Sequence, residues 1–300
     1  MAITHRNYLV AGLLGLIAAS AAALPRAAAP PRAAAAAPPG AAVAGPRAAA
    51  AAGVTAYWTR ARMARARPLG ALLPDSRGRP WQYGGEVARA TGKEFFTLNG
   101  AAYVCSGSTV DSANSDVVVT AAHCVADGTG AWAEHWIFVP GYAGGAAPYG
   151  SYTARRFFVA PGWDGGVNED DDVAFVTLNT ALVHGYRVHA GEEAGAQAIA
   201  FGAVPVRAYV FGYPAEPPYG GQQIDYCSGP VAERGTDPGL RCAMTAGDSG
   251  GPWLSGFSPR TGSGTIVAVS AFKYSDDIGT LYGADLGRAA KAAYERAQHA

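Results

Sequence analysis

The stretch Thr245–Pro252, read as TAGDSGGP, constrains the fold of this 300-residue chain more than any other. Three glycines and a proline surround Ser249. Glycine weakens helices and strands because it loses the most conformational entropy on folding, and proline lacks a backbone donor. The stretch is therefore predicted to be a sharply folded loop. Such a loop can turn the N–H groups of Gly247 and Ser249 toward one point beside an exposed hydroxyl, which is the geometry that stabilises an oxyanion.

A serine is a weak nucleophile on its own, so a catalytic role for Ser249 requires a base and a group that orients the base. His123 is the favoured base, because a β-branched run ends in small residues just before it, in VVVTAAHC. A lone histidine beside apolar residues is more often a core or turn residue. Five other histidines compete for the role: His5, His135, His184, His189 and His299.

Three adjacent acids offer the orienting carboxylate. Asp170, Asp171 and Asp172 stand directly before the strand-like run Val173–Leu178. An acidic turn solvated at the surface is the other interpretation of such a cluster. The residues alone leave open which of the three acids would orient the histidine.

The motifs VVTAAHC, DVAFVTL and GDSGGP, in this order, resemble the trypsin/chymotrypsin-like serine proteases, and secreted bacterial members of the actinobacterial type in particular. The resemblance covers residues 83–300. It implies that Ser249 is the nucleophile, His123 the base and Asp172 the orienting acid, since Asp172 directly precedes an aliphatic residue and alanine as the family's aspartate does. The N–H groups of Gly247 and Ser249 would form the oxyanion hole.

Short apolar runs separated by glycine, proline, asparagine and aspartate fill residues 83–300. Short strands with turn residues between them indicate an all-β sandwich or barrel. The resemblance implies two antiparallel six-stranded barrels, with His123 and Asp172 in the first and Ser249 in the second. Residues 284–300 carry an apolar stripe of helical period and are predicted to form a closing helix that packs against the second barrel.

The first 23 residues combine a basic start, an apolar run over Tyr8–Ala19 and four small residues. This is the pattern of a secretory signal peptide, with cleavage expected near Ala23. The run is shorter than the roughly 20 apolar residues that cross a bilayer, so an uncleaved anchor is the less favoured alternative. The protein is predicted to be secreted and extracellular, without a stable membrane span after processing.

Residues 24–82 are predicted to form a disordered arm before a protease domain at 83–300. Alanine, proline, arginine and glycine dominate its first half, and proline interrupts every alanine run. No core can form from this composition. The arm has nine arginines and one acid, a net charge of +8, whereas residues 83–300 have 13 basic and 22 acidic residues, a net charge of −9.

This charge asymmetry has two interpretations. One is a solvated linker. The sharper hypothesis is a pro-segment that docks on its own catalytic domain by charge attraction until it is cut at an arginine. Its contact and cleavage region would be Tyr57, Trp58, Arg60, Arg62, Arg65 and Arg67.

Four cysteines in an exported chain allow three disulfide pairings. The resemblance implies Cys105–Cys124, because family members bridge the cysteine after the histidine to a neighbouring strand. Cys227–Cys242 then remains. A loop of that size is stabilised by about 3 kcal/mol in the chain-entropy model.

Family members recognise the substrate side chain before the cut bond in a pocket near the serine loop. The resemblance places the floor of this pocket at Ala243. It implies that a later strand, which includes Ser270 and Phe272, also lines the pocket, and that Ser270 lies beside the orienting aspartate. No acid stands at Ala243, as an arginine or lysine preference would require, and Val269 stands where glutamate-cutting bacterial relatives carry histidine. The aromatic ring of Phe272 would partly fill the pocket, which indicates a preference for substrates with small or medium apolar side chains before the cut bond.

Asp248 has a counterpart in animal members that pairs with a new amino terminus after activation. This chain has no Ile-Val-Gly-Gly start, and only Gly84–Val87 is weakly similar. An arginine is the alternative partner expected for Asp248.

Together these features predict a secreted serine endopeptidase that acts on polypeptides through an acyl-enzyme, as a monomer without cofactor, metal or nucleic acid. One alternative is a catalytically silent, protease-like binding protein that captures peptides. Another is an esterase, since Gly247–Gly251 fits G-x-S-x-G. The esterase order of serine, acid and histidine does not match this chain.

Overall fold

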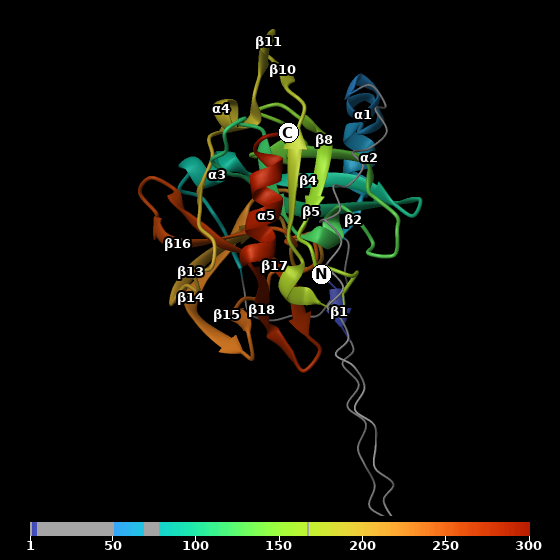
Figure 1. Cartoon of the computed structure of the whole chain (residues 1–300). Coiled ribbons are helices and arrows are strands. Elements are labelled where there is room, and N and C mark those ends of the chain that lie inside the picture. The colour runs from blue at the N-terminus through green and yellow to red at the C-terminus, as the bar shows by residue number, and fades with distance from the viewer. Residues whose placement is uncertain (1, 5–50, 69–77, 167) are drawn as a thin grey trace, which may run out of the picture.

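The computed structural model describes residues 2–4, 51–68, 78–166 and 168–300. Most of the predicted signal peptide and the first half of the predicted arm lie outside these residues. The described part is built mainly of β-strands, with one longer helix near the C-terminus (Figure 1). Within it, no helix is both long enough and apolar enough to cross a membrane.

The first barrel consists of six antiparallel strands in the order β5, β4, β7, β8, β9, β6, and β6 pairs back onto β5. Valine, isoleucine and phenylalanine suit these strands because their side chains pack well on a pleated surface. All eight residues of β4 are buried. The strands are β4 (Thr91–Leu98), β5 (Ala101–Thr109), β6 (Val117–Thr120), β7 (Glu134–Pro140), β8 (Tyr152–Val159) and β9 (Ala174–Leu178).

The second barrel also has six antiparallel strands, in the order β16, β13, β14, β15, β18, β17, and β17 pairs with β16 to close the ring. The prediction of two antiparallel six-stranded barrels is therefore confirmed. The strands are β13 (Arg207–Gly212), β14 (Asp225–Arg234), β15 (Asp237–Arg241), β16 (Pro252–Ser258), β17 (Ser263–Tyr274) and β18 (Asp277–Asp285).

Short elements flank or connect the two barrels. Strands β1, β3 and β12 extend the second sheet, and β10 and β11 form a separate hairpin. Their bounds are β1 (Ala2–Thr4), β3 (Arg79–Pro80), α3 (Glu86–Ala90), β10 (Ala181–Val183), β11 (Tyr186–Val188), α4 (Ala190–Ala194) and β12 (Ala198–Ile199).

One hydrophobic cluster runs from the first barrel into the second. It includes Phe95 and Val104 from the first and Phe211 and Leu254 from the second, all of them fully buried. Burying a side chain of this size contributes about 2–3 kcal/mol. The shared core fixes the two barrels against each other, which positions residues contributed by both of them.

The C-terminal helix α5 (Arg288–Ala297) forms where the apolar stripe predicts it, with Ala290, Ala293 and Ala297 buried. It packs across β8 and β9 of the first barrel. The prediction that this helix packs against the second barrel was therefore wrong. Tyr294 supplies the reason, because its ring meets Phe175 of β9 edge-on, with centroids 5.5 Å apart.

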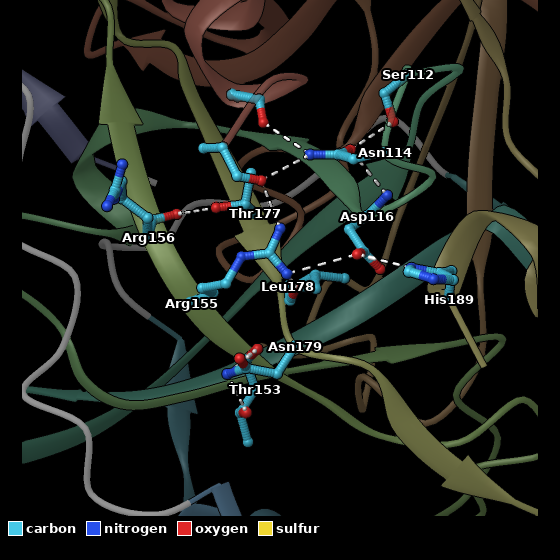
Figure 2. Close-up of polar contacts among 12 residues, drawn as sticks. Ser112, Asn114, Asp116, Thr153, Arg155, Arg156, Thr177, Leu178, Asn179 and His189 are labelled. Carbon is cyan, nitrogen blue, oxygen red and sulfur yellow. Dashed lines mark hydrogen bonds and ion pairs between the residues drawn. The ribbon is translucent and has the colours of Figure 1, made fainter. Parts of the chain in front are cut away.

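A polar network joins the end of the chain to the first barrel (Figure 2). Asn114 Nδ2 donates to the carbonyl oxygens of Ala297 and Ala300 at 3.0 and 3.2 Å. Arg155 Nη2 donates to Ala300 O at 2.7 Å, and its Nη1 lies 3.5 Å from Asp116 Oδ2. These bonds hold the last turn of α5 on the barrel.

Residues 51–68, which composition assigns to the disordered arm, form regular structure against the first barrel. Trp58 is 4% exposed and its Nε1 donates to His135 O at 2.5 Å, while Tyr57 stacks on the His135 ring with centroids 4.2 Å apart. These two aromatic residues give the alanine-rich segment a specific contact with the barrel. The average composition of the segment does not predict this contact. The elements are α1 (Ala51–Tyr57), α2 (Arg60–Arg65) and β2 (Arg67–Pro68), and β2 pairs with β5.

Candidate active site

The loop that carries Ser249 packs closely against the first barrel, and this close approach requires glycine. Gly250 has φ +81°, and a Cβ there would lie 2.2 Å from Thr120 Oγ1 and 2.3 Å from Ser106 O. Any larger residue would both strain the backbone and collide with the barrel. The glycines around Ser249 thus bring a loop of the second barrel against β5 and β6 of the first.

Ser106 on β5 fixes this loop in place. Its N–H donates to Ser249 O at 2.8 Å, and its Oγ donates to Gly247 O at 2.8 Å. The same Oγ accepts the N–H of Tyr213 at 2.8 Å. The sequence analysis missed this residue, although it directly follows Cys105, which the resemblance pairs with Cys124.

His123 and Asp172 meet because their strands are paired. Thr120 of β6 lies opposite Ala174 of β9, so residues just beyond this end of the two strands become neighbours. His123 lies in the short helix η1 (Ala122–Cys124), and Asp172 directly follows η2 (Glu169–Asp171).

The carboxylate of Asp172 binds His123 at two points. Its Oδ1 accepts the His123 backbone N–H at 2.9 Å, and its Oδ2 lies 2.6 Å from His123 Nδ1. Asp172 is 5% exposed. An acceptor at Nδ1 places the ring proton there and leaves Nε2 as the basic nitrogen.

The two neighbouring acids have other partners. Asp171 accepts a hydrogen bond from Asn168 Nδ2 at 2.9 Å, and Asp170 accepts one from Thr236 Oγ1 at 3.3 Å. Burial raises the pKa of Asp171, whereas Asn168 lowers it. Asp172 is thus the member of the acidic run that contacts His123.

His123 Nε2 and Ser249 Oγ are both buried, and neither has a hydrogen-bond partner among the described residues. Each unpaired buried group costs about 1–3 kcal/mol. Hydrogen bonds between a base and its nucleophile are often long before substrate binds and tighten in the complex. One atom is a ring nitrogen and the other a hydroxyl oxygen, the atom types that a base and a nucleophile supply.

The backbone beside Ser249 offers two free donors. Within the described residues neither the Gly247 nor the Ser249 N–H donates to a protein acceptor. Gly247 has φ +106°, and a Cβ there would lie 2.8 Å from Tyr213 O. Unpaired backbone N–H groups of this kind are what an oxyanion hole needs.

The residues assigned to the substrate pocket are all buried. Ser270 exchanges backbone hydrogen bonds with the serine loop, at 2.7 Å with Gly250 and 2.9 Å with Gly251. Its Oγ accepts from Trp253 Nε1 at 3.2 Å, and among the described residues no hydrogen bond joins it to the orienting aspartate. Phe272 stacks on Tyr282, with centroids 5.5 Å apart, and belongs to an aromatic cluster of the second barrel. Ala243 is 3% exposed.

Asp248 is fully buried, and neither of its carboxylate oxygens has a hydrogen-bond partner among the described residues. Burial raises its pKa to about 6, against the opposing attraction of Lys273. Lys273 is the described residue whose charge opposes this rise in pKa most, and no arginine is among the groups that do so. Lys273 follows Phe272 in β17, where a lysine inside a buried strand was the overlooked signal.

The disulfides are Cys105–Cys124 and Cys227–Cys242, the pairings that the resemblance implies. The first ties β5 to the residue after His123, and Cys124 Sγ lies 3.8 Å from Ser249 O. It thereby braces the histidine loop against the serine loop.

The family model described as Trypsin matches residues 76–284. The chain belongs to the Trypsin family. The matched range contains all three motifs and both disulfides. Serine peptidase chemistry follows as the activity class of this trypsin-family chain.

Two solved structures of bacterial-type proteases support this assignment. Protease Anisep from Arthrobacter nicotinovorans is 37% identical, with a TM-score of 0.65, over 71% of this chain and 96% of that one. The thermostable serine protease AL20 from an extremophilic microorganism is 30% identical, with a TM-score of 0.64, over 71% of this chain and 99% of that one.

A curated relative, the extracellular metalloprotease of Bacillus subtilis (strain 168), is 34% identical over 90 residues. The match spans 28% of this trypsin-family chain and 28% of the relative's length. Among the described residues, Cys105, His123 and Cys124 have ligand atoms within 4.8 Å of one another. These cysteines form a disulfide, so they offer no thiolate to a metal.

Proposed function

We propose that this trypsin-family chain is a secreted serine endopeptidase that hydrolyses peptide bonds through an acyl-enzyme, with Ser249 as nucleophile, His123 as base and Asp172 as the orienting acid. The observation that carries this proposal is the His123 ring. Its Nδ1 lies 2.6 Å from Asp172 Oδ2, while Nε2 is buried without a partner among the described residues. A ring held on one side and open on the other suits a general base beside a hydroxyl.

In the first half-reaction Ser249 Oγ attacks the substrate carbonyl carbon while His123 Nε2 takes the hydroxyl proton. The new bond moves the carbonyl electrons onto oxygen, where the N–H groups of Gly247 and Ser249 stabilise the negative charge. The intermediate collapses, the C–N bond breaks, and His123 returns the proton to the leaving amine. Asp172 stabilises the imidazolium throughout this step.

In the second half-reaction water takes the place of the amine. His123 Nε2 accepts a proton from water, whose oxygen attacks the ester carbonyl of the acyl-enzyme. Collapse of this second intermediate releases the carboxylic acid product and returns the proton to Ser249 Oγ. The two halves use the same base and the same oxyanion donors.

We further propose that the protein acts outside the cell. The signal pattern of residues 1–23 supports export, and two disulfides suit an oxidising compartment. Extracellular polypeptides are the corresponding substrates.

The arm is proposed to act as a pro-segment of this enzyme. The support is the contact of Trp58 and Tyr57 with the first barrel, and the pairing of β2 with Tyr103 and Val104 next to Cys105. Among the described residues no arginine of α2 forms an ion pair with the barrel, and Arg60 Nη2 donates to Gly144 O at 3.3 Å. Mass spectrometry of active secreted protein should find a mature N-terminus beyond residue 68. Full activity with a terminus near Leu24 would contradict it.

A serine-directed phosphonate tests the proposed chemistry. Wild type should be labelled covalently at Ser249, and Ser249→Ala should not. Ser228→Ala, at an exposed serine of β14, is the matched control and should label as wild type does. Folded wild type that neither labels nor cleaves a mixed peptide library would instead be a silent binding protein.

A further inference from the structure

A buried glutamate takes no part in the proposed mechanism, although hydrogen bonds link it to the serine loop. Glu94 on β4 is fully buried. Its Oε1 has no hydrogen-bond partner among the described residues, and its Oε2 lies 3.0 Å from Thr120 Oγ1. Gly107 on β5 makes room for this group, because a Cβ there would lie 2.4 Å from Glu94 Oε1. The fold thus encloses a carboxyl group among strands of the first barrel.

Thr120 on β6 joins Glu94 to Ser106. Thr120 Oγ1 lies 3.0 Å from Glu94 Oε2 and 2.9 Å from the carbonyl oxygen of Ser106. A hydroxyl has one hydrogen, and a carbonyl oxygen can only accept. Both contacts are hydrogen bonds only if the Thr120 hydroxyl donates to Ser106 O and accepts from Glu94. An ionised carboxylate has no hydrogen to donate, so this geometry requires Glu94 to be a neutral acid.

Burial favours the same protonation state. It raises the pKa of Glu94 well above the ordinary value for glutamate, while the hydrogen bond to Thr120 acts in the opposite direction. Within the described part of the chain Glu94 forms no ion pair. A buried carboxylate without a counter-charge is strongly disfavoured, and such a group becomes protonated instead.

Ser106 extends this chain of hydrogen bonds to the proposed oxyanion hole. Its N–H donates to Ser249 O and its Oγ donates to Gly247 O, each at 2.8 Å. These carbonyls belong to the two residues whose N–H groups are proposed to stabilise the oxyanion. Thr120 Oγ1 also lies directly beside Gly250, where it leaves no room for a Cβ. The serine loop therefore rests on Ser106 and Thr120, and Thr120 in turn is bonded to Glu94.

Stability of the barrel does not account for an acid at this place. Burying a carboxyl group with one unpartnered oxygen is unfavourable, and an apolar side chain of similar size would fill the space without that cost. The neutral carboxyl supplies what an apolar side chain lacks, an O–H donor. By donating to Thr120 Oγ1, it directs the only hydrogen of that hydroxyl to Ser106.

We propose that Glu94 is a positioning residue: as a neutral acid it directs the Thr120 hydroxyl to Ser106, and Ser106 holds the residues that carry the oxyanion donors. This inference rests on the proposed endopeptidase function. Oxyanion donors lower the barrel's reaction barrier only when they are fixed in place before the reaction. A small displacement of Gly247 and Ser249 should therefore lower the rate of the chemical step without weakening substrate binding.

The kinetic test uses the secreted, processed protein and one peptide substrate. Glu94→Met fills the space without a donor, whereas Glu94→Gln keeps a donor in its amide group. Glu94→Met should lower kcat about 10-fold and change KM by less than about twofold, because the lost effect belongs to the transition state. Glu94→Gln should recover most of that loss. Turnover is counted per site titrated with the serine-directed phosphonate, so that unfolded protein does not contribute.

Thr120→Val and Thr177→Val form a matched pair. The two threonines are fully buried at opposite ends of the β6–β9 pairing, and Thr177 Oγ1 donates to Arg156 O at 3.3 Å (Figure 2). Both variants therefore lose a buried hydroxyl that donates to a carbonyl oxygen. Thr120→Val should lower kcat as Glu94→Met does, and Thr177→Val should not. Equal losses would assign the effect to general destabilisation and overturn the proposal.

Infrared difference spectroscopy tests the proton on Glu94 without any activity measurement. Wild type compared with Glu94→Gln at neutral pH should show the carbonyl stretch of a neutral carboxylic acid, which the variant lacks. A carboxylate band in its place would overturn the inference. The spectrum and the threonine pair decide the matter even if Glu94→Met does not fold.

The proposed function and this inference fail in different ways. A Glu94→Met enzyme with the kcat of wild type would overturn the positioning role, and phosphonate labelling of Ser249 would leave the proposed function standing. Wild type that is neither labelled nor active would overturn the proposed function, and the positioning role with it.

Discussion

The first barrel contains two His–Asp pairs that use the same atoms. His123 Nδ1 lies 2.6 Å from Asp172 Oδ2, and His189 Nδ1 lies 2.8 Å from Asp116 Oδ2. Both aspartates are nearly fully buried. The histidines differ, because the side chain of His123 is 15% exposed and that of His189 is 41% exposed.

The surroundings of the two carboxylates differ as well. Asp172 uses both oxygens on one residue, the backbone and the ring of His123. Asp116 shares one oxygen between His189 and Arg155, and its other oxygen has no partner among the described residues (Figure 2). A His–Asp contact therefore does not by itself define a catalytic base. What distinguishes the first pair is a second ring nitrogen that is enclosed and unpartnered.

The largest expected effect is a difference in turnover between the asparagine variants of the two aspartates. Asp172→Asn should lower turnover of a peptide substrate by about 10⁴-fold, because an amide favours the wrong ring tautomer and cannot stabilise the imidazolium. Asp116→Asn should change turnover by less than about threefold, since its histidine lies at the barrel surface. Steady-state kinetics on both purified variants, with folding checked by circular dichroism, gives the comparison.

Equal losses in the two variants would show that both pairs act on the reaction. An unchanged Asp172→Asn enzyme would remove Asp172 from the proposed mechanism. The neighbouring Asp171→Asn is a further control, because Asp171 bonds to Asn168 and should have little effect.

The motifs of the first pair were readable from the sequence, and the second pair was not. VVTAAHC and DVAFVTL pointed to His123 and Asp172, because each residue lies in a short local motif that carries the family resemblance. His189 and Asp116 are 73 positions apart, and no local pattern joins them. Their contact depends on how the chain before α4 returns to the start of β6, which is a property of the tertiary fold.

The two aspartates should rank in the opposite order when stability is measured instead of turnover. Asp116→Asn should lower the free energy of unfolding by about 2 kcal/mol, because hydrogen bonds to charged groups are worth about 1.5–3 kcal/mol. For a domain of this size that corresponds to a fall in Tm of roughly 4–8 °C. Asp172→Asn keeps one carbonyl oxygen for the His123 N–H and should cost less. Thermal unfolding of the two variants side by side measures the difference, and a larger fall for Asp172→Asn would contradict it.

The difference between local motifs and tertiary contacts also explains which other features the sequence did and did not predict. Short strands between turn residues were sufficient to indicate an all-β sandwich or barrel, because turn chemistry is a local signal, and the family resemblance supplied the two barrels. The docking face of α5, the contact of Trp58 with His135, and the hydrogen bond of Ser270 to Trp253 were not predictable. Each is set by which surfaces the closed barrels bring together. Lys273 was overlooked for the same reason, since the carbonyl oxygens of Cys242 and Ile278 that its Nζ contacts are brought beside it only by the folded barrel.

The smallest effect concerns His189 itself. His189→Gln keeps a donor that can reach Asp116, and the ring it replaces is well exposed, so the free energy of unfolding should fall by less than about 1 kcal/mol. Arg155 still lies beside the same oxygen, which limits the loss further. His123→Gln, by contrast, should abolish turnover with a similarly small change in Tm. A His189→Gln variant as unstable as Asp116→Asn would show that the histidine, and not Arg155, neutralises the buried acid. The anchoring of α5 through Arg155 and Ala300 would then be a consequence of the His–Asp pair.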